Sequence, residues 1–168
     1  AVANFGLDTG ILRFAKKDNA ILGLAFKFYL ALGAATAILG FLTAPFIAAF
    51  LGYPQIINLL RLGFVGIIFI LLSNFFVAAL QISGQFTKAS IVGISSNIAR
   101  LLILGIAYYF FTVNLYFLTI LFFFVVIVSV VLGKLYQPVN FSKTTVSAKE
   151  FFKYNSWIAL SLIVSSIP

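Results

Sequence analysis

Four charged side chains fall within long apolar stretches of this sequence: Asp8, Lys27, Arg61 and Arg100. A charge at the centre of a bilayer costs about 2.5–3.5 kcal/mol on insertion scales, so such a residue needs a partner or water. Lys27 is expected near one end of its helix, where its long side chain can reach the membrane surface. The other three side chains lie where they can bind an ion or a charged ligand.

Arg100 is expected to lie deepest, since it follows Lys88 by about 12 residues and a helix rises roughly 1.5 Å per residue. Gly93, Ser96 and Asn97 precede it at helical spacing, so all four share one polar or small face. We expect this face to line a water-filled cavity in which the guanidinium binds an anion. A purely structural ion pair is the alternative.

Arg61 and Asp8 are less deeply placed. Arg61 follows Pro54 by about seven residues, roughly 10 Å from the surface, so it can either reach outward or line the same cavity. Asp8 can neutralise an arginine of another helix, or it can carry a coupling H⁺ or Na⁺. Arg13 follows it near the expected membrane boundary.

The composition excludes several other kinds of chemistry. The chain is 63% hydrophobic and 8% charged, too few polar residues to cover a soluble domain, so the lipid bilayer is its expected partner. It has no Cys and no His, and its acidic residues are few and scattered, so no metal site, bound cofactor or enzymatic activity is expected. The net charge of +8 does not indicate nucleic acid, because the cations separate apolar blocks instead of forming one basic face.

The apolar blocks must therefore supply the elements that position these charges. They are continuously apolar and do not alternate, which predicts helices and not a barrel. The expected fold class is an all-α, polytopic transmembrane helix bundle. The expected spans are 1–14 (partial), 20–51, 56–82, 90–111, 115–135 and 157–168 (partial), with a cytoplasmic linker at 137–154.

Basic residues alternate between the connections of these spans. The connections at 13–19, 85–88 and 134–153 are basic, whereas 52–55 and 112–114 carry no Lys or Arg. The positive-inside rule therefore predicts a multi-pass protein of the plasma (inner) membrane with the three basic connections in the cytoplasm. Within the last one, the sequence VSAKEFFKY predicts a short amphipathic helix on the inner surface.

Small residues at helical spacing predict where helices pack closely in lipid. One set follows the second span, and Gly63 with Gly66 forms a shorter one. The longer set consists of Gly33, Ala37, Gly40 and Ala44.

Three stretches also follow the pattern of a known family. The first is NFGLDTGILRFAKKD, and the second covers 44–110, with the turn from Gln81 to Phe86 and a following helix that carries Asn97 and Arg100. The third is FFKYNSWIALSLIVSSIP. In this order they resemble the end of span two, spans three to five and the entry to span seven of the polysaccharide flippases. These belong to the superfamily of multidrug, oligosaccharidyl-lipid and polysaccharide exporters.

The resemblance implies an internal fragment of a transporter, the first bundle of a two-bundle exporter fold that works by alternating access. The second half of the same chain would complete the central cavity. The implied substrate is a polyprenyl-diphosphate-linked oligosaccharide, which is moved from the cytoplasmic to the outer leaflet for cell-surface polysaccharide biosynthesis. Arg100, then Arg61 and Arg13, would pair with the diphosphate, and Ser96 and Asn97 would contact sugar or phosphate.

Two other functions stay open at this point. A multidrug or toxic-compound antiporter of the same superfamily would move organic cations and would favour carboxylates over arginines in its cavity. A non-transporting membrane scaffold for glycan assembly would instead pair its deep charges internally.

Overall fold

The computed structural model describes residues 11, 13–14, 21–110, 115–139 and 147–165, and no strand occurs among them. The expected all-α membrane bundle is confirmed. Among the described residues, four helical segments are long and apolar enough to cross a membrane, which makes this a multi-pass membrane protein. The elements are α2 (Ile21–Phe50), the short 3₁₀ helix η2 (Pro54–Ile56), α3 (Ile57–Ile82), α4 (Phe86–Phe110), α5 (Leu115–Tyr136) and α6 (Ala148–Ser165).

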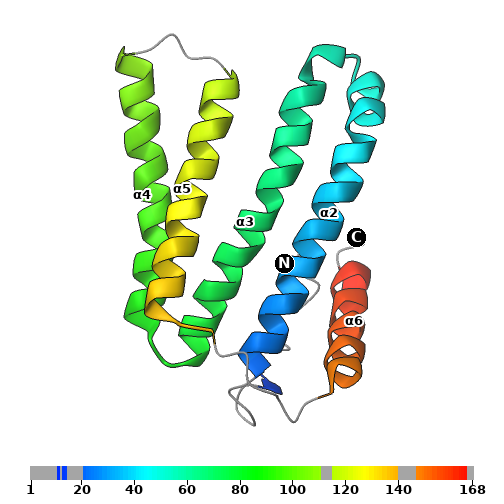
Figure 1. The fold of residues 1–168 in the computed structure, drawn as a ribbon, viewed down its shortest axis with the longest axis vertical. Coiled ribbons are helices and arrows are strands. Elements are labelled where there is room, and N and C mark those ends of the chain that lie inside the picture. The colour runs from blue at the N-terminus through cyan, green and yellow to red at the C-terminus, as the bar shows by residue number, and fades with distance from the viewer. Residues whose placement is uncertain (1–10, 12, 15–20, 111–114, 140–146, 166–168) are drawn as a thin grey trace.

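Two antiparallel hairpins, α2–α3 and α4–α5, form most of the bundle (Figure 1). They lie together near the α3–α4 turn and splay apart at the opposite end, so that α3 and α5 diverge. Lys88 and Lys134 belong to the ends of α4 and α5 beside the α3–α4 turn, and Lys149 belongs to the first turn of α6 at the same end of the bundle, which we call the basic end.

The α3–α4 turn is shorter than the sequence pattern predicts. Gly84 has a φ of 72°, a left-handed conformation that glycine adopts without steric cost, so the chain reverses within residues 83–85. Helix α4 therefore begins at Phe86 and not at residue 90, and Lys88 lies in its first turn. The Lys88 ammonium is 5.7 Å from the ring centre of Tyr136 at the end of α5.

Helix α2 packs on α3 through the predicted stripe of small residues, and all four members are buried. A Cβ added at Gly33 would lie 3.2 Å from the Cα of Ile68, and one at Gly40 would overlap the ring of Phe64. The predicted packing role of this stripe is confirmed. The stripe consists of Gly33, Ala37, Gly40 and Ala44.

Helix α5 crosses α3 at two glycines. A Cβ at Gly66 of α3 would overlap the ring of Phe123, and a Cβ at Gly133 of α5 would lie 2.5 Å from the Cβ of Phe76. Nothing lies within 4 Å of a Cβ added at Gly63. Of the predicted pair, only Gly66 is therefore a packing residue.

The largest buried cluster lies toward the basic end, where aromatic rings of α2, α3 and α6 meet. The Phe75 ring centre is 5.4 Å from that of Phe26 and 5.5 Å from that of Tyr29. Phe151 of α6 is fully buried, and its ring packs against those of Phe14 and Phe28. This core holds α2, α3 and α6 together toward the basic end, whereas the ends of the helices that splay apart are less covered.

The start of helix α6 differs from the prediction, which placed a linker at 137–154 and the start of a span at residue 157. One continuous helix begins at Ala148 and runs past Trp157, which is 64% exposed. The reason is that Phe151 buries its ring in the protein core, so this side of the segment is covered by protein and not by lipid headgroups. Of the expected partial span over 1–14, only residues 11, 13 and 14 are described, so Asp8 lies outside the described residues.

Candidate functional site

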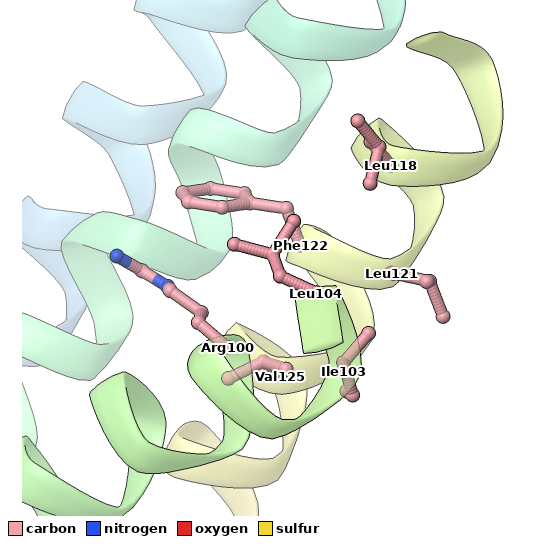
Figure 2. A pocket seen from close by; sticks show the side chains of 7 residues that line it. All are labelled: Arg100, Ile103, Leu104, Leu118, Leu121, Phe122 and Val125. Atoms are coloured by element: carbon pink, nitrogen blue, oxygen red, sulfur yellow. The ribbon is translucent and has the colours of Figure 1, made fainter. Parts of the chain in front are cut away.

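Arg100 lies at the wall of a cavity between α4 and α5 (Figure 2). The cavity has a volume of about 180 Å³. The side chains of Arg100 and Phe122 extend in the same direction, away from Ile103 and Leu121. The lining residues are Arg100, Ile103, Leu104, Leu118, Leu121, Phe122 and Val125. All of these except Arg100 are apolar, so a cavity adjoins Arg100, but its walls are not the polar ones that were expected. The predicted binding of an anion there stays a prediction.

The Arg100 guanidinium rests on an aromatic ring. Its Cζ is 4.1 Å from the centre of the Phe122 ring, and its Nε is buried without a hydrogen-bond partner. Glu150, on α6, is the only acidic residue among those described, and no ion pair joins it to Arg100.

The ring alone does not offset the cost of placing this charge in the membrane. A desolvated cation–π contact contributes about 2 kcal/mol, less than the cost of about 2.5–3.5 kcal/mol on insertion scales. The Nε–H, buried without a hydrogen-bond partner, is one of the groups whose desolvation this cost includes. A bound anion would offset the remainder, and such binding stays a prediction.

Ser96 and Asn97 do not line this cavity with Arg100. The Ser96 hydroxyl donates to the carbonyl oxygen of Gly93 at 2.9 Å, and the Asn97 amide donates to the same oxygen at 3.4 Å. Helix α4 turns Arg100, Ile103 and Leu104 toward α5, which is the face defined by i, i+3 and i+4. The contacts proposed for Ser96 and Asn97 stay predictions.

Arg61 faces a different helix. Its Cζ is 4.8 Å from the ring centre of Phe41 on α2, and its Nε is buried without a hydrogen-bond partner. It is not among the residues that line the cavity of Arg100.

Arg13 is exposed, and its Cζ is 4.4 Å from the ring centre of Tyr154 on α6. The three arginines named as candidates thus rest on rings from three different helices, and the structure does not gather them around one cavity. A shared role for Arg13, Arg61 and Arg100 in binding stays a prediction, as does coupling through Asp8.

Phe122 is the site residue that sequence reasoning did not single out. Helix α5 carries three consecutive phenylalanines, and nothing in their order distinguishes them. Their packing distinguishes them, because Phe122 lies against Arg100, Phe123 lies against Gly66 of α3, and Phe124 is 60% exposed. Only the rotation of α5 between its two neighbours determines which ring meets the cation.

Comparison with known proteins gives one match. A family model described as "Polysaccharide biosynthesis protein" matches residues 1–167. Neither a curated protein nor a solved structure matches the chain. The matched range contains all the described helices and the cavity of Arg100.

Proposed function

The chain belongs to the polysaccharide biosynthesis protein family, and we propose that it serves this biosynthesis as a transporter of lipid-linked oligosaccharide. In the proposed reaction the lipid carrier, a polyprenyl diphosphate, moves with its glycan from the cytoplasmic to the outer leaflet. The protein makes and breaks no covalent bond in this process.

The observation that carries the proposal is Arg100, whose guanidinium rests on the Phe122 ring and whose Nε is buried without a hydrogen-bond partner. It lies in an apolar span, with no carboxylate against it among the described residues and a cavity beside it. A guanidinium presents its donors in a planar fork, which matches the oxygens of a phosphate. In an apolar surrounding such a pair is stronger than in water. These features support a diphosphate as the charged part of the ligand.

The uneven packing of the bundle supports alternating access. The buried aromatic cluster joins α2, α3 and α6 toward the basic end, whereas the other end has an open groove of about 320 Å³ along α3, which Thr119 of α5 also lines. Movement of one hairpin against the other can change this groove without dismantling the core. A second helix bundle in the same chain would complete the transport path, and H⁺ or Na⁺ is the proposed coupling ion.

A transport assay tests the proposal directly. Liposomes containing the full-length protein are loaded with fluorescent lipid-linked oligosaccharide, and its appearance in the opposite leaflet is followed. We expect a rate well above that of protein-free liposomes, unaffected by excess organic cation. A rate equal to that of protein-free liposomes favours the scaffold, and transport of the organic cation instead favours a multidrug antiporter.

The proposed orientation places the basic end in the cytoplasm. Gln55 and Lys149 are both exposed and lie at opposite ends of the bundle. Cysteines introduced at these two positions should therefore react with a membrane-impermeant maleimide from opposite sides, Gln55→Cys in intact cells and Lys149→Cys only in inverted vesicles. Labelling of Lys149→Cys in intact cells would contradict this orientation.

A further inference from the structure

The cavity of Arg100 has a charged end and an apolar end. Arg100 and Phe122 lie on one side of it, with Ile103 and Leu121 on the other (Figure 2). We propose that this crevice between α4 and α5 holds the hydrocarbon chain of the same lipid whose phosphate pairs with Arg100. This inference rests on the proposed function and deepens it, because it assigns the lipid chain a binding site of its own.

The size and the walls of the crevice suit a hydrocarbon. A dry apolar cavity of about 150 Å³ is large enough to hold benzene, and this one has about 180 Å³. A buried water needs two to four polar partners, whereas Arg100 is the only lining residue with a polar side chain. The crevice therefore takes up chain in preference to water.

The crevice is open at one wall of the described bundle. Leu104 lines it and is 48% exposed, so no described residue seals this wall. A chain can enter sideways between α4 and α5 while its phosphate moves along the guanidinium.

Apolar walls alone do not select one lipid, because an ordinary acyl chain is as apolar as leucine. Selection comes from Arg100 at the charged end and from its depth. A ligand that carries phosphate and chain on one molecule engages both parts at once, and the second contact forms at high effective concentration. A phospholipid also carries both, but a resident phospholipid keeps its phosphate at the membrane surface, whereas Arg100 follows Lys88 by about 12 residues of α4, roughly 18 Å of helix. The occupant to which this geometry points is therefore the lipid carrier during its passage and not a resident phospholipid.

Filling the crevice tests the proposal. The variants are Leu104→Trp on α4 and Leu118→Trp on α5, which narrow the crevice from opposite walls. If one of them does not fold, the other still provides the test. The control is Leu101→Trp, because Leu101 is 72% exposed and does not line the crevice. Binding of a long-chain polyprenyl diphosphate and of inorganic diphosphate, which has no chain, is measured in nanodiscs containing the full-length protein.

We expect the wild type and Leu101→Trp to bind the long-chain ligand at least about tenfold more tightly than inorganic diphosphate, a difference of about 1.4 kcal/mol. In the two filling variants this ratio should fall, while the affinity for inorganic diphosphate is kept. If neither filling variant changes this ratio, the crevice does not hold the lipid chain. If phosphatidylglycerol displaces the long-chain ligand as readily as unlabelled ligand does, the crevice is a phospholipid site and the proposal is also wrong.

The experiment distinguishes an error in the assignment of the crevice to the lipid chain from an error in the proposed function. If Arg100→Ala binds both diphosphates as the wild type does, the guanidinium holds no phosphate and both proposals fall. If binding requires Arg100 but is unchanged in the filling variants, only the assignment of the crevice to the lipid chain is wrong.

Discussion

Arg100→Ala is expected to lower the rate of lipid-linked oligosaccharide transport at least about tenfold. Hydrogen bonds to a charged group contribute about 1.5–3 kcal/mol each, and about 1.4 kcal/mol corresponds to a tenfold change. Arg100→Lys keeps the charge but loses the planar fork that matches phosphate, so an intermediate rate is expected. The measurement is the initial transport rate in liposomes, normalised to the amount of protein inserted.

The control for this series is Lys149→Gln, which removes one positive charge from an exposed position at the start of α6, away from the cavity. It should transport at the wild-type rate. Wild-type transport by both Arg100 variants at normal abundance would exclude pairing between Arg100 and the diphosphate. A loss of abundance that accounts for the whole loss of transport would instead identify the contact between Arg100 and Phe122 as packing, as the scaffold function predicts.

Gly133→Ala is expected to destabilise the crossing of α3 and α5. The new Cβ would lie 2.5 Å from the Cβ and 2.7 Å from the Cγ of Phe76. These atoms are close to the α3 backbone, and Phe76 is only 2% exposed, so the ring cannot simply rotate away. The two helices must separate, and overpacking of this kind costs typically about 1–3 kcal/mol.

The matched control is Gly63→Ala, because nothing lies within 4 Å of the added Cβ. Alanine favours a helix over glycine by up to about 1 kcal/mol, so this variant should be as stable as the wild type or slightly more stable. Thermal unfolding in nanodiscs measures the difference. Equal unfolding temperatures for the two variants would show that α3 and α5 do not cross at Gly133.

Gly66→Ala should fall between these two variants. Its added Cβ meets the far end of the Phe123 ring, and that end can move more easily than the Cβ of Phe76. The order of stability among three single-methyl additions therefore reports the geometry of one helix crossing.

The sequence by itself determined the class of the protein and the approximate extent of its helices. About 20 consecutive apolar residues can satisfy their backbone in lipid only as a helix, so composition and length are sufficient for that prediction. It also determined that the small-residue stripe of α2 packs closely on another helix, because small residues repeated along one helix face permit close approach whatever the partner helix is. That this partner is α3 came from the structure. The resemblance in residue order to the polysaccharide flippases agrees with the family match over residues 1–167.

The tertiary structure decided which side chains meet. Arg100 was identified from its depth, but its contact with Phe122 and the apolar walls beside it depend on how α5 is rotated about its axis. The spacing of Ser96 and Asn97 indicated a shared polar face, yet both donate hydrogen bonds to the backbone of their own helix. Periodicity is a property of one helix, whereas a site between helices depends on the rotation and crossing of two, which are set by packing contacts between residues far apart in the sequence.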